Sequence, residues 1–246
     1  MTQLVSVITP VHAPSVGYLA DAYRSLAEQV MPDGWAWEWL VQEDGQTGLL
    51  DGLLPDDPRI SVGTGRAGGP GVARTLALAR AAGELVKVLD ADDQLLPGVL
   101  ARDIEALTQH PDIGWTASRV LDLLPDGSTV GFEEDPPDGP IARGVVLDFW
   151  RAHDHRASVH PASLCLRRDL LLALGGWMAL PASEDTGLLI AASVVCDGYF
   201  TADPGLHYRK WPGQVTNQAA HREPGEFAAR MNLIEERAKA LRSLLG

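Results

Sequence analysis

Several residue types are scarce in this sequence of 246 residues. It has two cysteines, Cys165 and Cys196, which lie far apart and lack the close paired spacing of zinc and redox motifs. We therefore expect buried free thiols rather than a disulfide. Basic residues are also few, since 20 Lys and Arg face 33 Asp and Glu for a formal net charge of −13. This balance argues against general binding to nucleic acid or to anionic lipid, because both need clustered Lys and Arg.

Long apolar runs are absent as well. No stretch approaches 18 uninterrupted apolar residues, and the N-terminus lacks the basic region, apolar run and cleavage site of a signal peptide. We expect no membrane span and a cytoplasmic location. With 46% hydrophobic and 22% charged residues, a packed core is expected. The length suits one globular unit, which can consist of two abutting halves.

In the first half, strand patterns alternate with helical ones. Apolar and β-branched stretches predict strands at 4–11, 36–42, 59–62 and 84–90. Helical patterns begin at Ser15 and Pro70 and cover 97–109, and Gly83 follows the end of the second. In the first helix, one face is expected to hold Tyr18, Ala22, Leu26 and Val30. This alternation predicts an α/β fold with a mostly parallel, doubly wound sheet.

The second half has a different pattern. A strand and hairpin are expected over 113–133, with a turn at 125–128 and an acidic, Pro-rich loop after it. Further helices are predicted at 144–153, 168–174 and 184–195, with short strands near 161–166 and 205–210. The last predicted helix, 225–245, carries an apolar stripe of Phe227, Met231, Ile234, Ala238, Leu241 and Leu245. We interpret the stripe as packing onto the domain or a dimer partner rather than as membrane attachment, since the opposite face is not predominantly basic.

An acidic cluster, VLDADDQ at 88–94, follows one predicted strand directly, and Asp44 follows another. Ligands of open parallel sheets bind outside the carboxyl ends of the strands, so these carboxylates are expected to converge on one crevice. Neighbouring carboxylates repel by about 4 kcal/mol per pair at an effective dielectric near 20, and a divalent cation relieves this. Mg²⁺ or Mn²⁺ suits such oxygen ligands. The alternative is that these residues cap the next helix, as Asp93 could do for the helix near Pro97.

These segments together resemble a known family. SVITPVHAP at 6–14, EDG at 43–45, GGPGVARTLALARAAGELVKVLDADD at 68–93 and SED at 183–185 are similar to motifs of the inverting family 2 glycosyltransferases. Their order extends the resemblance from residue 4 to about residue 218. It implies the GT-A fold, a Rossmann-like and mostly parallel sheet flanked by helices, with an antiparallel acceptor-side half. It further implies a nucleotide-sugar-binding half at 1–112, an acceptor-binding half at 113–222 and a C-terminal helix at 223–246.

The resemblance also implies donor-side roles. The loop Pro10, Val11 and His12 would lie against the nucleotide, and Asp44 would hydrogen-bond the base. Turn formation by Pro10 and an Asx-turn at Asp44 are the structural alternatives. Gly69 and Arg74 are expected near the nucleotide and its phosphates, and Asp90 is expected to contact the ribose or metal-bound water. Asp92 is implied as the direct ligand of Mn²⁺ or Mg²⁺, which would neutralise the pyrophosphate of the donor.

On the acceptor side, Glu184 and Asp185 resemble the ED motif of the family, whose aspartate is the general base toward the acceptor hydroxyl. One base is sufficient for a direct displacement that inverts the configuration. A structural alternative is that Ser183 caps a helix whose first turn holds both acidic residues. Trp177 is a candidate for lining the acceptor pocket, with core packing as the alternative.

Residues 208–216, YRKWPGQVT, look like the YRxHxxS segment that closes over the donor phosphates in the family. Arg209 and Lys210 would contact phosphate. Trp211 stands where histidine is usual, and because an indole cannot ligate a metal, it could instead stack on a sugar or the acceptor. Three other histidines have no spacing that indicates a metal site and are interpreted as surface or interface residues: His153, His155 and His160.

The leading hypothesis is a metal-dependent glycosyltransferase that uses a UDP-, GDP- or dTDP-linked sugar and a small-molecule or glycan acceptor, with a homodimer possible. A nucleotidyltransferase would have a Gly-rich loop with a basic residue after the first strand, which TPVHAP at 9–14 lacks. A haloacid-dehalogenase-type phosphatase would have its DxD motif there. A sugar-nucleotide sensor without turnover stays open at this point.

Overall fold

The β-branched runs of the first half form a parallel sheet. The structure, a computed structural model, describes residues 2–214, 216 and 223–245. The first four strands are β1 (Gln3–Val11), β2 (Trp35–Glu43), β3 (Ile60–Gly63) and β4 (Leu85–Val88). β1 pairs in parallel with β2 on one side and β4 on the other, and β2 pairs in parallel with β3. The chain therefore reverses its direction of travel across the sheet between β1 and β4, at a topological switch point where crevices form.

The second half extends the same sheet with mixed pairing. Its strands are β5 (Gln94–Leu95), β6 (Ile113–Leu123), β7 (Thr129–Val130), β8 (Gly139–Ile141), β9 (Cys165–Arg167) and β10 (Asp197–Arg209). Among the described residues, the main order is β3-β2-β1-β4-β9-β6-β10-β5. β9 is antiparallel to β4 and β6, whereas β6 and β10 are parallel.

The predicted strand near 205–210 proves to be a strand of 13 residues. Its first part was obscured because Gly198 and Pro204 interrupt the strand pattern, and the pairing shifts register near both of them. The second half, which was predicted to be antiparallel, is consequently mixed. The hairpin of β6 and β7 and the predicted turn before Ser128 are present.

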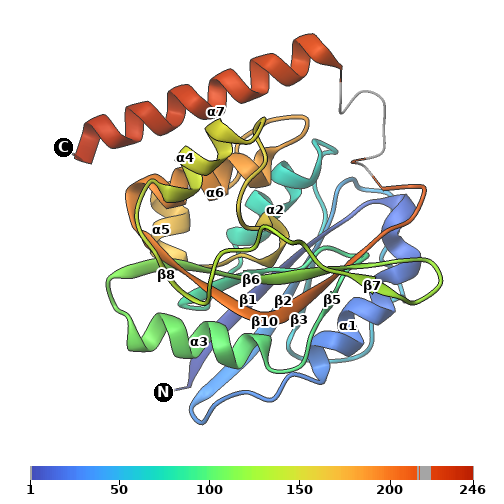
Figure 1. Cartoon of the computed structure of the whole chain (residues 1–246). Helices are drawn as coiled ribbons and strands as arrows, with labels where there is room; N and C mark the ends of the chain where they lie inside the picture. Colours follow the sequence, from blue (N-terminus) through green and yellow to red (C-terminus); the bar gives the residue numbers. More distant parts are fainter. Residues whose placement is uncertain (1, 215, 217–222, 246) are drawn as a thin grey trace.

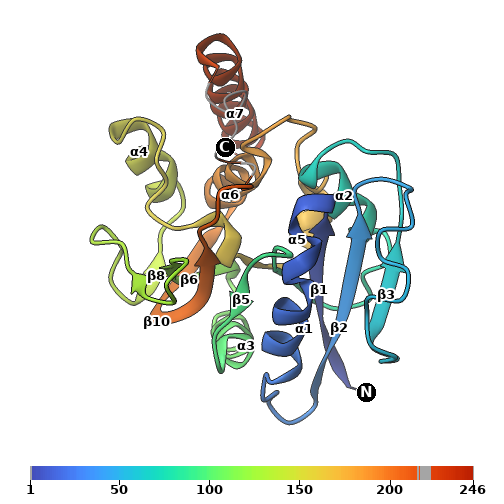
Figure 2. The same cartoon turned by 90° about the vertical axis from the view of Figure 1, so that its right-hand side faces the viewer.

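Helices cover both faces of the sheet (Figures 1 and 2). On one face lie α1 (Leu19–Ala27), entered through the 3-10 helix η1 (Ala13–Tyr18), and α3 (Val99–Gln109). The other face is covered by α2 (Pro70–Leu78), α4 (Val145–Ala152), α5 (Arg168–Ala173) and α6 (Glu184–Val195). The last helix, α7 (Pro224–Leu245), packs on α6 as an outer layer (Figure 1).

Alternation along the strands divides the core into two. Val7 packs with Leu26 of α1 on one face, whereas the next residue, Ile8, packs with Ile190 of α6 on the other. Both faces are therefore buried, which explains why these strands are apolar throughout. The α/β sheet flanked by helices was predicted correctly.

The first helix is shorter than its pattern predicted. α1 ends at Ala27, and Val30 is 79% exposed, so the prediction that Val30 shares the buried face is wrong. Val30 continues the apolar period by coincidence after the helix has ended, and Pro32 and Gly34 then form a turn signal. Ala22 and Leu26 are buried as predicted.

The C-terminal helix packs onto the domain. Met231, Ile234 and Ala238 of α7 are buried in the core beside α6, while Phe227 is 38% exposed and the side chain of Leu245 lies outside the described residues. No helix in the described part of the chain is both long and apolar enough to span a membrane. Cys165 and Cys196 are free thiols, as predicted.

Candidate active site

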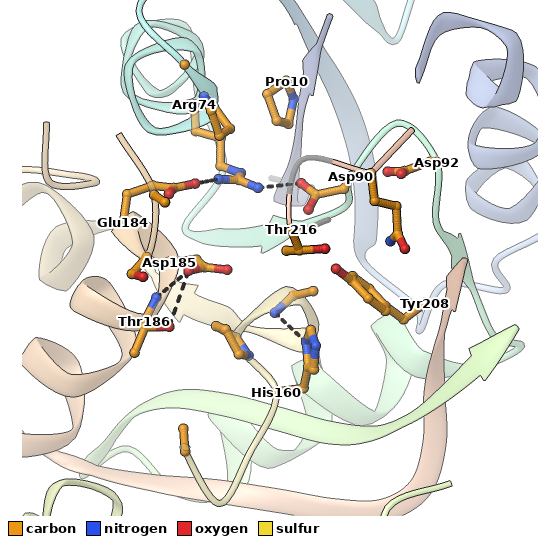
Figure 3. Close-up of a pocket in the computed structure, with 18 of the residues that line it drawn as sticks. Pro10, Arg74, Asp90, Asp92, His160, Glu184, Asp185, Thr186, Tyr208 and Thr216 are labelled. Carbon is orange, nitrogen blue, oxygen red and sulfur yellow. Dashed lines mark hydrogen bonds and ion pairs between the residues drawn. The ribbon is translucent and has the colours of Figure 1, made fainter. Parts of the chain in front are cut away.

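A cavity of about 570 Å³ lies at the carboxyl ends of β1, β2 and β4 (Figure 3). This volume is in the range of small-molecule sites. Ten of the predicted site residues line it: Pro10, Val11, His12, Asp44, Gly69, Arg74, Asp90, Asp92, Glu184 and Asp185. These residues, up to 175 positions apart in the chain, come together because the ends of the parallel strands share one edge of the sheet and the start of α6 meets them there.

Asp44, after β2, organises the glycine-rich loop. Its carboxylate accepts hydrogen bonds from the backbone N–H of Gly68 at 2.7 Å and of Gly69 at 3.1 Å. Gly69 has φ of 88°, a left-handed conformation that favours glycine, and Pro70 starts α2 directly after it. Gly71 is required for a different reason: a Cβ there would lie 2.7 Å from Cγ of Glu184. The loop thus lets α2 approach the start of α6 closely.

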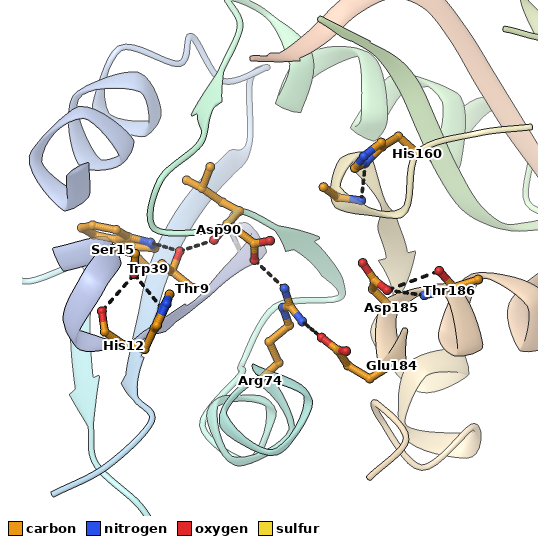
Figure 4. Close-up of polar contacts among 12 residues, drawn as sticks. Thr9, His12, Ser15, Trp39, Arg74, Asp90, His160, Glu184, Asp185 and Thr186 are labelled. Carbon is orange, nitrogen blue, oxygen red and sulfur yellow. Dashed lines mark hydrogen bonds and ion pairs between the residues drawn. The ribbon is translucent and has the colours of Figure 1, made fainter. Parts of the chain in front are cut away.

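Arg74 of α2 connects the two acidic motifs (Figure 4). Its Nη2 donates to Asp90 at 2.6 Å and its Nη1 to Glu184 at 2.8 Å, and its side chain is only 4% exposed. Although burial lowers it, the pKa of Arg74 is raised overall by the charges of Asp90 and Glu184, so the guanidinium is charged at any accessible pH. The sequence resemblance predicted that Arg74 would lie near phosphate. In the structure, Arg74 lines the cavity and has two carboxylate partners.

The ionisation of this network is decided at Glu184. Burial, and then the charge of Asp185, raise the pKa of Glu184 to about 7, against the opposing effect of Arg74. A charged arginine therefore faces a carboxyl group that titrates near neutral pH. Asp90 completes the arrangement as its more exposed member, at 24% of its side-chain surface.

Asp92 follows β4 and is largely buried. Burial and the neighbouring charge of Asp90 raise the pKa of Asp92. Its Oδ2 accepts a 2.6 Å hydrogen bond from the indole Nε1 of Trp211. Close by, His12 hydrogen-bonds Ser15 through Nδ1 at 3.0 Å, while its buried Nε2 has no hydrogen-bond partner among the described residues. This end of the cavity therefore holds two carboxylates, of which one raises the pKa of the other, and one buried nitrogen without a hydrogen-bond partner among the described residues.

A complete metal site of three or more His, Cys, Asp or Glu side chains is not found in the described ranges. This is compatible with a divalent cation of the Mg²⁺ type, which is commonly bound by one or two carboxylates together with substrate phosphate oxygens. Asp92 and Asp90, whose mutual repulsion a cation would relieve, fit that kind of site.

Asp93 does not cap α3, contrary to the alternative considered from the sequence. The helix begins at Val99 after Gly98, and Asp93 instead accepts the backbone N–H of Arg209 at 2.9 Å. Arg209 also donates to the backbone oxygen of Asp92 at 2.8 Å and pairs with Asp21 at 2.9 Å. The end of β10 is therefore fastened to the acidic turn, a contact between residues 116 apart that no local pattern indicates.

Asp185 lies in the first turn of α6. Its Oδ1 accepts the backbone N–H of Thr186 at 2.6 Å, which leaves Oδ2 without a partner among the described residues. Ser183 precedes the helix with φ of 63° and makes no side-chain cap, so the capping alternative is wrong in that respect. This sharp turn sends Glu184 toward Arg74 and Asp185 into the cavity (Figure 3).

Four predicted residues do not line the main cavity, and two of these line a smaller depression beside it. Trp177 is 5% exposed within the core, as the structural alternative expected, and its ring centroid is 5.9 Å from Cζ of Arg74. Lys210 pairs with Asp122 at 3.1 Å, and neither it nor Arg209 is among the residues that line the main cavity. Lys210 and Trp211 line a smaller adjoining depression.

Sequence reasoning missed one wall of the cavity. It is built from two loops and the end of β10, and its residues include Phe132, Glu134, Asp135, His155, Arg156, His160 and Tyr208. His160 and His155 had been interpreted as surface or interface histidines, but both line the cavity. Loop residues have no periodic pattern that could have revealed this.

The sheet order, the helical layers and the carboxylates at the strand ends define a domain of the GT-A fold. The chain belongs to glycosyl transferase family 2, whose family model matches residues 6–130. The predicted family and fold are thus confirmed.

The chain is similar to parts of two longer proteins. It is 30% identical over 182 residues to the O-antigen biosynthesis protein RfbC of Myxococcus xanthus, a match that covers 70% of this chain and 13% of that protein. The structure of S. aureus TarS 1-349 in complex with UDP-GlcNAc aligns with a TM-score of 0.72 at 20% identity, over 95% of this chain and 66% of that one. The full S. aureus TarS aligns with a TM-score of 0.64, over 94% and 38%. The chain therefore spans less than two thirds of each of these relatives.

Proposed function

We propose that this protein is a metal-dependent, inverting glycosyltransferase that moves a sugar from a nucleoside diphosphate to an acceptor hydroxyl. The observation that carries the proposal is the single cavity shared by Asp92 at the end of β4 and Asp185 at the start of α6. Donor binding falls to residues before 113 and acceptor binding to residues 113–222. UDP is the preferred nucleotide, because the S. aureus TarS structures with similar folds contain UDP or UDP-GlcNAc.

At the donor end, Asp92 would hold Mn²⁺ or Mg²⁺ with Asp90 beside it. When bound, the cation would neutralise charge on the diphosphate and so favour its departure. His12, Asp44 and the amides near Gly69 surround the space for the nucleotide. A chain with a net charge of −13 needs such local compensation to bind a diphosphate.

At the acceptor end, Asp185 is the general base. Its Oδ1 is held by Thr186, so Oδ2 is the oxygen available to take the proton of the acceptor hydroxyl. The acceptor oxygen forms a bond to the anomeric carbon while the bond from that carbon to the diphosphate oxygen breaks, and the nucleoside diphosphate leaves. Attack from the face opposite the diphosphate inverts the anomeric configuration, without a covalent glycosyl-enzyme.

The test is to incubate the protein with UDP-, GDP- and dTDP-sugars and Mn²⁺ and to follow release of nucleoside diphosphate, with a chelator-treated sample in parallel. We expect release from UDP-sugars in the presence of metal and its loss with chelator. Binding of a UDP-sugar without release, both alone and with a panel of glycoside acceptors, would instead indicate a sensor. Release of inorganic pyrophosphate from a nucleoside triphosphate and a sugar phosphate would indicate nucleotidyl transfer.

A further inference from the structure

His160 is held in a single hydrogen-bonding state beside Asp185. It precedes the 3-10 helix η2 (Pro161–Ser163), and its Nδ1 accepts the backbone N–H of Ala162 at 3.2 Å. Burial lowers the pKa of His160, which keeps the imidazole neutral near pH 7. A neutral imidazole whose Nδ1 accepts a hydrogen bond carries its proton on Nε2. The ring therefore offers an Nε2–H donor, and it lines the same cavity as Asp185.

An aromatic wall adjoins this donor. The ring of His160 lies with its centroid 4.7 Å from that of Tyr208 and 6.2 Å from that of Phe132, and all three residues line the cavity. Such a wall with a few polar groups at its edge matches a sugar ring, whose C–H face is apolar and whose rim carries hydroxyls. In Figure 4, His160 and Asp185 lie on one side of the site, and His12 and Asp90 lie on the other.

The charges on this side favour a neutral ligand. Three carboxylates, Glu134, Asp135 and Asp185, and one cation, Arg156, line the cavity on this side, so negative charge is in excess. Arg119 pairs with Asp135 at 2.9 Å, and the exposed Arg156 lies 3.9 Å from Glu134. An anionic acceptor would bring further negative charge to this wall and be repelled.

We infer that this wall is the acceptor subsite for a neutral carbohydrate, in which His160 donates a hydrogen bond from Nε2 to one oxygen of the sugar while Asp185 accepts the attacking hydroxyl. Phe132 and Tyr208 contact the apolar face of the ring. The inference builds on the proposed function by naming the acceptor class and a residue that binds the acceptor. The proton of the attacking hydroxyl goes to Asp185, and His160 keeps its own.

The variants His160→Phe and His160→Gln separate shape from hydrogen bonding. Phenylalanine retains an aromatic ring without the donor, whereas glutamine retains an N–H donor without the ring. His153→Gln is the matched control, because His153 is on the same loop but is exposed and outside the cavity lining. The probes are neutral methyl glycosides of glucose, galactose, mannose, rhamnose and N-acetylglucosamine, and glucose-1-phosphate serves as the charged counterpart of the glucoside.

Binding of each probe in the presence of UDP and Mn²⁺ is measured by saturation-transfer NMR, so no turnover is needed. We expect at least one neutral glycoside to bind. Its affinity should fall about fivefold in His160→Phe, be partly restored in His160→Gln and stay unchanged in His153→Gln, since one hydrogen bond is worth about 1 kcal/mol and 1.4 kcal/mol is tenfold. Calorimetry should give the same UDP affinity for all four proteins.

The inference is overturned if no neutral glycoside binds to the wild type, if His160→Phe binds as tightly as the wild type, or if glucose-1-phosphate binds more tightly than methyl glucoside. UDP release from UDP-GlcNAc is followed on the same samples. Glycoside binding that depends on His160, without any release of UDP, would support the subsite and contradict the proposed transferase activity. Release of UDP, together with glycoside binding that does not depend on His160, would support the transferase activity and contradict the subsite.

Discussion

Replacing Arg74 with methionine should destabilise the protein strongly. The substitution leaves Asp90 and Glu184, which Arg74 contacts at 2.6 and 2.8 Å, without their common partner, and the side chain of Glu184 is only 6% exposed. Each attraction is of the order of 4 kcal/mol at an effective dielectric near 20, and removing one partner of a buried pair typically costs about 3–5 kcal/mol. We therefore expect Arg74→Met to lower the free energy of unfolding by about 3–5 kcal/mol.

The assay is urea unfolding at about pH 8, above the pKa of about 7 of Glu184. Arg151→Met is the matched control, because Arg151 also bridges two carboxylates, at 2.5 and 3.1 Å, but with its side chain 37% exposed. It should cost less than about 1 kcal/mol. The double variant Arg74→Met/Glu184→Met should be more stable than Arg74→Met alone, because the buried unpaired charge is gone. Equal losses for Arg74→Met and Arg151→Met, or a double variant worse than the single one, would refute this account of the network.

Further predictions concern the residues around this network. Asp92→Asn should abolish the metal-dependent part of UDP binding. In calorimetry, chelator should lower the UDP affinity of the wild type and leave that of Asp92→Asn unchanged. Because the folded pKa of Glu184, about 7, exceeds its unfolded value near 4.3, the stability from its protonated form is fully present below about pH 4 and is lost as pH rises through 7. Glu184→Gln should thus flatten the decline of unfolding free energy over this interval by up to about 4 kcal/mol, and urea titrations showing parallel wild-type and variant profiles would contradict this. Gly71→Ala should lower the free energy of unfolding by about 1–3 kcal/mol, since the new Cβ would lie 2.7 Å from Cγ of Glu184 and 3.0 Å from the backbone oxygen of Met178. A melting temperature equal to that of the wild type would contradict this.

Local patterns predicted those parts of the fold that are themselves local. The predicted bounds of α6 agree with the structure, and β1 is one residue longer than predicted, because apolar periodicity and the turn residues after Val11 lie within one stretch of sequence. Strand β10 was largely missed, since Gly198 and Pro204 disguise it and its partner β6 is about 80 residues away. The helix pattern overshot α1 for the opposite reason, as Val30 continues the apolar period after the helix has ended.

The same distinction applies to the candidate site. Residues within recognisable motifs, such as Asp92 and Asp185, lie in one cavity, because parallel strand ends and the start of α6 meet there. His160 was not predicted, since its role depends on a loop that folds back beside Tyr208. The hydrogen bond from Trp211 to Asp92 joins residues 119 apart, and no spacing in the sequence indicates that contact.

The reaction itself is tested most directly at Asp185. We expect Asp185→Asn to bind UDP-GlcNAc with nearly the wild-type affinity in the presence of Mn²⁺, because the side chain lies at the acceptor end of the cavity. Its rate of transfer should fall by about 100-fold or more, which is the usual contribution of a general base. The decisive measurement is the rate of UDP release by Asp185→Asn at saturating donor and acceptor. A collapse of this rate with donor affinity retained is the predicted result, and a rate equal to that of the wild type would contradict the assignment of the base.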